Sequence, residues 1–349
     1  MERRNFIKKT TALTALSLVP APFLFADTKT TEKNKELKIL PKRLKKGDVI
    51  GLIAPAGIIT EKQLKNTIES VEKLGYKSYH TNSALSKYGY FAGKDKERAD
   101  DLMHMFTNKN VAGILCIRGG YGAMRILDML DYDLINQNPK VFIGYSDITA
   151  FLSSIYENTG LITFHGPVGI SSFNEFTVNS YRNIIETPQN KYKYQYLREK
   201  NTEETSEFDV YTINEGKAEG ELIGGNLSVI VSMIGTKFEP NFENKIVFIE
   251  EIDEKTYKVD RMLTQLVQAT NIKKASGIVL GIFKKCDQDE EPKLSLKEAI
   301  TDILKPLNIP VSYGMAFGHV ANKMTIPVGI KAKMNADKNS LKLLEKAVL

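Results

Sequence analysis

Short apolar runs alternate with longer amphipathic segments along most of this chain. Val49–Ala56 is apolar throughout, as expected for a buried parallel strand, and a helical pattern then begins after the N-cap candidate Thr60 and stops at Gly75. The same alternation continues downstream and predicts a parallel sheet with helices on both faces. We expect further strands at 111–117 and 141–144, and helices at 94–108, at 123–130 and from 147 onward.

The alternation lapses and then resumes, which predicts two domains. Residues 171–214 are rich in Asn, Glu, Tyr and Lys and are interpreted as a linker. We therefore predict an α/β fold with a doubly wound, Rossmann-like N-terminal domain at 47–170 and a smaller C-terminal α/β domain at 215–349. In the second domain we expect strands at 219–223, 245–249, 277–283, 311–315 and within 330–344, and helices at 226–234, 259–270 and 296–304.

The N-terminus has the pattern of an export signal. Arg3, Arg4 and two lysines precede an uncharged stretch, so residues 1–26 are predicted to be a signal peptide of the twin-arginine type. The alternative is a general secretory signal, because two arginines alone are a weak pattern. Either signal predicts an exported, periplasmic protein, and without a working leader the protein would be cytoplasmic. Residues 27–46 are polar and lysine-rich and are predicted to be a flexible tether.

Composition excludes some partners. The net charge is +6, and because four basic residues and one acid lie in the first 26 positions, the rest of the chain carries +3. Such a small excess predicts no nucleic-acid binding. After the leader no stretch approaches the roughly 18 apolar residues of a membrane helix, so no membrane span is expected in the mature protein. Cys116 and Cys286 lie at or near the ends of predicted apolar strands and are expected to be buried free thiols.

Ser146 lies between a predicted strand and a predicted helix. A strand-to-helix turn of this kind lifts a hydroxyl out of the sheet and points the amides of the helix N-terminus at a developing oxyanion. Ser146 is therefore a candidate nucleophile, although Gly144-Tyr-Ser146-Asp lacks the second glycine of the usual elbow. The alternative is a structural N-cap, a common position for serine.

A serine nucleophile needs a base, and histidine is the usual one. His165 ends a strand-like segment, whereas His319 follows Gly318 in a loop, and the residues alone favour His319 only slightly. Glu250 directly follows the apolar strand 245–249 and is the candidate acid that would orient the histidine. The chain has four histidines in all: His80, His104, His165 and His319.

Six motifs together resemble the LD-carboxypeptidases, the serine peptidases that include microcin C self-immunity proteins. Six blocks in a fixed order over roughly 270 residues are far more specific than an isolated motif. The resemblance implies that Ser146 is the nucleophile, Glu250 the acid and His319 the base. A slip of one position would replace Glu250 by Glu251, since the family acid is usually followed by Asp. The blocks are Ile53-Ala-Pro-Ala-Gly57, Arg118-Gly-Gly-Tyr-Gly122, Gly144-Tyr-Ser-Asp147, Gly224-Gly-Asn-Leu227, Phe248-Ile-Glu-Glu251 with Asp260-Arg261 downstream, and Gly318-His319.

The resemblance also implies the groups around the reacting atoms. The oxyanion hole would use the backbone amides of Asp147 and of Gly119 or Gly120. A carboxypeptidase must hold a terminal carboxylate, for which Arg118 is a candidate, and Asn226 is a second candidate for substrate binding.

The resemblance implies a reaction as well. We expect the release of terminal D-Ala from murein tetrapeptides through an acyl-enzyme, with a peptidoglycan-derived peptide as substrate, no metal or organic cofactor, and a homodimeric protein. One alternative is a microcin-immunity-like amide hydrolase of peptide-nucleotides. The other is a periplasmic solute-binding protein, because two α/β domains with an export signal also describe that class.

Overall fold

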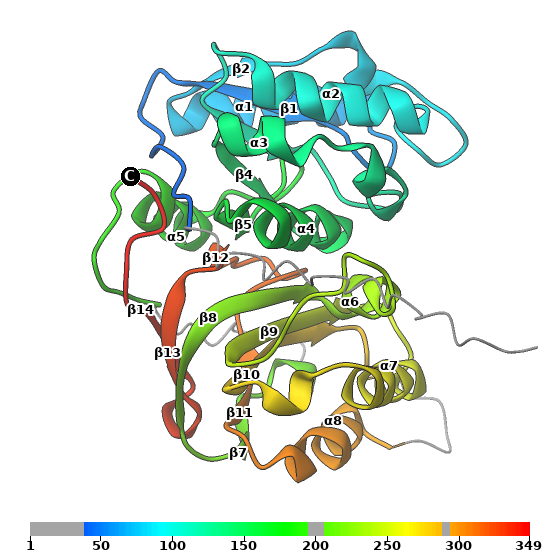
Figure 1. The fold of residues 1–349 in the computed structure, drawn as a ribbon, viewed down its shortest axis with the longest axis vertical. Helices are drawn as coiled ribbons and strands as arrows, with labels where there is room; N and C mark the ends of the chain where they lie inside the picture. The colour runs from blue at the N-terminus through cyan, green and yellow to red at the C-terminus, as the bar shows by residue number, and fades with distance from the viewer. Residues whose placement is uncertain (1–37, 195–205, 288–293) are drawn as a thin grey trace, which may run out of the picture. The chain divides into compact units, whose positions relative to one another are not determined.

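The computed structural model describes residues 38–194, 206–287 and 294–349, which belong to one compact unit containing two β-sheets (Figure 1). The predicted signal peptide and residues 27–37 of the predicted tether lie outside the described residues. Residues 38–46 do not behave as a tether, because the Leu44 side chain is buried and its amide donates to the Ile185 carbonyl. The fold therefore begins earlier than the strand at Val49.

The first sheet has the strand order β12-β5-β4-β3-β1-β2, with every pair parallel except β12 and β5. This confirms the predicted parallel N-terminal sheet. The order reverses between β1 and β3, and the carboxyl ends of strands beside such a reversal are where open α/β sheets bind ligands. The strands are β1 Val49–Ile53, β2 Lys77–Tyr79, β3 Gly113–Cys116, β4 Val141–Gly144, β5 Thr163–His165 and β12 Ile326–Val328.

The helices of this half begin and end largely where sequence signals place them. The first helix starts with a capping box between Thr60 and Gln63 and stops at Gly75, whose φ is +98°. The helix predicted at 123–130 is instead a 3₁₀ helix at Met124–Met129. A helix that was not predicted, α5, lies inside the predicted linker. The helices are α1 Glu61–Leu74, α2 Asp95–Thr107, α3 Tyr132–Gln137, α4 Thr149–Thr159 and α5 Glu175–Ile185.

The second sheet has the order β6-β14-β13-β8-β9-β10-β11-β7, and its central strands β8 to β11 run parallel. This sheet has more strands than the first. Its strands are β6 Tyr192–Lys193, β7 Tyr211–Asn214, β8 Lys217–Asn226, β9 Lys245–Ile252, β10 Gly277–Lys284, β11 Val311–Met315, β13 Lys331–Asn335 and β14 Ser340–Leu343, and its helices are α6 Leu227–Met233, α7 Thr256–Ala269 and α8 Leu296–Leu304.

The chain crosses between the sheets more than once. Strands β6 and β7, which lie in the predicted linker, join the second sheet, whereas β12 returns from the C-terminal part to pair with β5. The mixed α/β class is confirmed, and the predicted domain boundaries stay a prediction.

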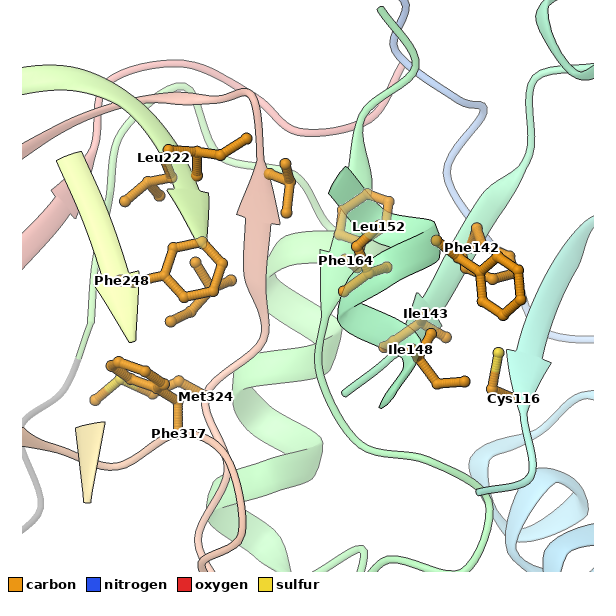
Figure 2. Packing of buried hydrophobic residues seen from close by; sticks show 14 of the residues in the cluster. Cys116, Phe142, Ile143, Ile148, Leu152, Phe164, Leu222, Phe248, Phe317 and Met324 are labelled. Carbon is orange, nitrogen blue, oxygen red and sulfur yellow. The ribbon is translucent and has the colours of Figure 1, made fainter. Parts of the chain in front are cut away.

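Buried apolar side chains from both sheets form one cluster (Figure 2). Helix α4 packs against β8 and α6, and Thr149 at its start accepts a hydrogen bond from the Asn226 amide across the two halves. Both cysteines, Cys116 and Cys286, are buried and free, as expected. Among the described residues, no helix is long and apolar enough to cross a membrane.

Candidate active site

Ser146 stands at the turn between β4 and α4 in a backbone conformation that is rare for its type. Its φ is +65°, in the left-handed region that a residue with a Cβ seldom occupies. Strain of this kind persists where the surrounding structure enforces it, and it is typical of a strand-to-helix turn that presents a nucleophile. The N-cap alternative does not describe this turn, because Tyr145 occupies the N-cap position of the 3₁₀ turn Ser146–Ile148 and Ile148 occupies that of α4.

The Gly119-Gly120 loop packs directly against Ser146. A Cβ placed on Gly119 would lie 2.9 Å from the Ser146 Cβ, 3.1 Å from its Oγ and 3.2 Å from the Asp147 amide nitrogen. Only glycine therefore lets this backbone approach the serine and the first amides of the following turn. The loop is fixed from its other side, where the Gly57 amide donates to the Gly119 carbonyl at 3.1 Å.

The buried Asp147 side chain ties the same loop to the start of α4. Its Oδ2 accepts a hydrogen bond from the Ala123 amide at 2.8 Å. Burial raises the pKa of Asp147 to about 6, although the Ala123 amide and the positive charge of Arg98 oppose the rise. Asp147 thus contributes a structural side chain in addition to the amide predicted for it.

Glu250 and His319 are in direct contact. Nδ1 of His319 lies 2.7 Å from Oε2 of Glu250, whose side chain is fully buried, whereas the histidine side chain is 14% exposed. Burial alone would raise the pKa of Glu250, but the charge and hydrogen bond of His319 outweigh it and hold the pKa below its usual value. A Cβ on Gly318 would lie 2.2 Å from the same carboxylate oxygen, so glycine is required beside this histidine.

The adjacent acid, Glu251, points elsewhere because successive side chains of a strand alternate between its faces. Its carboxylate accepts from the Asn226 side chain at 2.9 Å and from the amide and hydroxyl of Ser228 at 2.7 and 2.6 Å. Burial and the charge of Glu250 raise its pKa. Glu251 therefore supports the N-terminus of α6, and Glu250 is the acid that meets the histidine.

The two predicted substrate-binding residues have structural partners. Asn226 is the N-cap of α6, where its Oδ1 accepts from the Val229 amide and its amide group donates to Glu251. Arg118 is partly buried, and its Nη1 donates to the Ile58 carbonyl at 2.9 Å. Both lie at carboxyl ends of strands, beside the candidate nucleophile or acid, but their polar groups are partly engaged within the protein.

Tyr145 connects the serine turn to the histidine loop. Its ring lies edge-on to the His319 ring with centroids 4.8 Å apart. The residue before the candidate nucleophile therefore touches the candidate base, which brings the turn after β4 and the loop after β11 together. Tyr121, which directly follows the Gly119-Gly120 loop, and Tyr90 have rings 5.7 Å apart that are 56% and 65% exposed.

His165, the competing histidine, lies behind this contact. It is fully buried, and within the described part of the chain neither ring nitrogen has a hydrogen-bond partner. Burial lowers its pKa to about 4, with the charge of Glu250 acting against the shift. A histidine without access to solvent is poorly placed to exchange a proton with a substrate.

Family models match the two parts of the chain that carry these residues. The family model of the LD-carboxypeptidase N-terminal domain matches residues 50–166, and that of the C-terminal domain matches residues 219–334. The chain belongs to the LD-carboxypeptidase family. Membership makes it a serine-type carboxypeptidase in general and argues against a solute-binding protein.

Relatives of two kinds occur within the family. A probable murein peptide carboxypeptidase of Bacillus subtilis is 39% identical over 86% of this chain and 92% of its own length. The microcin C7 self-immunity protein MccF of Escherichia coli is 31% identical over 86% of this chain and 94% of its own. Among solved structures, the muramoyltetrapeptide carboxypeptidase of Oxalobacter formigenes superimposes with a TM-score of 0.72, at 29% identity over 84% of this chain and 97% of that one.

Sequence reasoning about this LD-carboxypeptidase missed several residues of the region. It did not predict the hydrogen bond of the Asp147 carboxylate to Ala123 or the contact of the Tyr145 ring with His319. It also did not predict that Glu250 packs against Gly318. Only the Gly318-His319 dipeptide carried a usable signal, because a glycine beside a functional residue often marks a close approach. The other contacts join segments far apart in the sequence.

Proposed function

We propose that this LD-carboxypeptidase releases the terminal D-alanine of murein tetrapeptides, with Ser146 as nucleophile, His319 as base and Glu250 as the acid that orients the base. The observation that carries the proposal is the contact of the Glu250 carboxylate with His319 Nδ1 beside a serine in a strained strand-to-helix turn. A carboxylate partner selects the tautomer with the proton on Nδ1, which leaves Nε2 to receive the serine proton.

The reaction follows from these assignments. His319 Nε2 takes the proton of the Ser146 hydroxyl as its Oγ attacks the peptide carbonyl, and the charge on Glu250 stabilises the imidazolium that forms. The same proton then passes to the leaving amine of D-alanine, and an acyl-serine ester remains. Water, deprotonated by His319, hydrolyses the ester and regenerates the serine.

The negative oxygen of the tetrahedral intermediate needs preorganised donors. The proposed donors are the amide of Asp147 and an amide of the Gly119-Gly120 loop, since this loop approaches both Ser146 and the Asp147 nitrogen. Loss of one such donor typically costs about 3 kcal/mol of transition-state stabilisation. The Asp147 carboxylate keeps the loop and the turn in register through Ala123.

A second candidate function is hydrolysis of a peptidyl-nucleotide amide. It is favoured by the 31% identity to a microcin C7 self-immunity protein, and a solved structure of that protein holds aspartyl sulfamoyl adenosine. The same serine chemistry serves both substrates. The murein substrate is preferred because the 39% identical relative is a probable murein peptide carboxypeptidase.

The test is a substrate panel for the protein lacking residues 1–26. We expect alanine release from muramyl tetrapeptide ending in D-Ala, little from the same peptide ending in L-Ala, and none from muramyl tripeptide. A chiral assay identifies the released amino acid. Cleavage of a peptidyl nucleotide with no action on any muropeptide would replace the first candidate function by the second.

A further inference from the structure

A cluster of aromatic rings lies behind the contact between Glu250 and His319, and His165 is at its centre. The His165 ring meets Phe248 edge-on with centroids 5.4 Å apart, and it meets Tyr145 and Phe317 at 6.1 Å each. Two further contacts close the cluster, between Tyr145 and His319 at 4.8 Å and between Phe248 and Phe317 at 5.9 Å.

The three partners of His165 come from the three segments that carry the proposed catalytic residues. Tyr145 directly precedes Ser146. Phe248 lies two positions before Glu250 on β9 and so shares its face of the strand. Phe317 lies two positions before His319, and Figure 2 shows both phenylalanine rings among the buried side chains. A single imidazole therefore contacts each segment once.

Backbone pairing of His165 with two neighbouring strands also holds its ring in place. His165 is the last residue of β5, where it pairs with Gly144 of β4 and with Ile326 of β12. Gly144 is two residues before Ser146 in the same segment. The strand that carries His165 is thus paired with the strand that leads into the Ser146 turn.

The imidazole also stays uncharged. Burial lowers its pKa to about 4, even though the Glu250 carboxylate opposes the shift. A positive charge on His165 would interact with the Glu250 carboxylate and would also repel a positive charge on His319. A neutral ring leaves the charge of Glu250 to the imidazolium of His319.

We propose that His165 is a positioning residue whose neutral ring joins the segments of Ser146, Glu250 and His319 and sets their spacing for proton transfer. The proposal rests on the proposed serine mechanism but not on the identity of the substrate. Catalysis is sensitive to such spacing, because a misplacement of about 1 Å can cost about a hundredfold in rate.

The test compares His165→Ala with Phe164→Ala. Phe164 is the preceding residue of β5, equally buried and on the opposite face of the strand, so its loss leaves a comparable cavity away from the ring cluster. For both variants we would measure Tm, kcat and KM for D-alanine release, and the rate at which a fluorophosphonate probe labels Ser146. Probe labelling reports the reactivity of Ser146 even if the natural substrate is a different amide. An error in the proposed substrate can therefore be distinguished from an error in the proposed role of His165.

We expect His165→Ala to lower kcat and the labelling rate by about tenfold or more while KM changes by less than about threefold. Phe164→Ala should lower Tm comparably and keep kcat and labelling close to those of the unmodified protein. Equal losses of kcat in both variants, or unchanged labelling in His165→Ala, would overturn the proposal.

Two further variants cover the case in which His165→Ala does not fold. His165→Phe keeps an uncharged ring at the centre of the cluster, and we expect it to recover most of the labelling rate. His165→Asn keeps a polar group without the ring and should not. A folded His165→Phe protein that labels as slowly as His165→Asn would contradict a role for the ring.

Discussion

Glu250 and Glu251 are adjacent on β9 but serve different parts of the molecule. The first carboxylate meets His319, and the second holds Asn226 and Ser228 at the start of α6. The alternation of side chains along a strand is sufficient to separate the two. Mutation of each acid to its amide should therefore affect different properties.

Glu250→Gln should lower kcat by about 10³-fold or more, because the amide can orient the wrong imidazole tautomer and carries no charge for the imidazolium. Glu251→Gln should cost roughly 1 kcal/mol of stability and leave kcat within about threefold. Steady-state kinetics and urea unfolding of both variants check this. The reverse pattern would move the proposed acid to Glu251.

Tyr121, next to the Gly119-Gly120 loop, is a further candidate for substrate contact. Tyr121→Ala should raise KM by about tenfold, because Tyr121 directly follows the Gly119-Gly120 loop with an exposed ring, and tyrosine is enriched among residues that dominate binding. Tyr88→Ala is the matched control, since Tyr88 is exposed to 55% against 56% for Tyr121. A KM that is unchanged in Tyr121→Ala, or equally raised in Tyr88→Ala, would exclude this contact.

The positions of single residues could be predicted where the local sequence explains them. Ser146 and Glu250 follow apolar strands, so their places at carboxyl ends could be predicted from the residues. The choice of His319 over His165 came from the family resemblance, because the position of His319 in a loop after Gly318 favours it only slightly over His165 at a strand end. The ring cluster joins positions 145, 165, 248 and 317, and no local pattern predicts contacts at that separation.

At the element scale, the start of α4 and the loop after β3 act together through Asp147. The carboxylate accepts from the Ala123 amide, and burial raises its pKa from 3.8 to about 6. A raised pKa means that the folded protein takes up this proton more readily than the unfolded chain. Its contribution to stability is therefore present below the unfolded pKa and is lost as pH rises through about 6.

Asp147→Asn removes this titration while keeping an oxygen acceptor for Ala123. We expect the unmodified protein to gain about 2 to 3 kcal/mol of unfolding free energy relative to the variant between about pH 7 and about pH 4. Urea unfolding of the two proteins across this range measures the difference, in which the other titrating groups cancel. A constant difference would show that Asp147 titrates normally in the folded state.

Elements with strong end signals were predicted closely, such as α1 between its capping box and Gly75. Helix α5 was missed although Asn174 caps it through the Thr177 amide, because the surrounding polar composition suggested a linker. Strand β12 lies at the edge of the first sheet and contains Pro327. Proline has no N–H to donate to a neighbouring strand, so it is disfavoured in interior strands. Its pairing with β5 depends on the tertiary fold.

At the scale of the whole molecule, the two sheets are interleaved rather than joined by one linker. Strand β12 belongs to the first sheet, β6 and β7 belong to the second, and one apolar cluster spans both. This arrangement brings the turn after β4 against the loop after β11, where the proposed residues meet. A homodimer, which the family resemblance implies, stays a prediction.

Export is proposed from residues 1–26 alone. We expect this leader to carry a folded reporter protein to the periplasm, and joint substitution of Arg3 and Arg4 by lysine to block the transport. Cell fractionation with the reporter signal measures both. Export that survives the double substitution would indicate a general secretory signal, and a reporter retained in the cytoplasm would contradict export.

The proposed mechanism assigns the release of D-alanine to Ser146 and His319. The most direct measurement is the rate of D-alanine release from muramyl tetrapeptide by the protein lacking residues 1–26, beside Ser146→Ala and His319→Ala. We expect release by the unmodified protein and a fall of about 10³-fold or more in each variant. Absence of release by the unmodified protein, or continued release by Ser146→Ala, would contradict it.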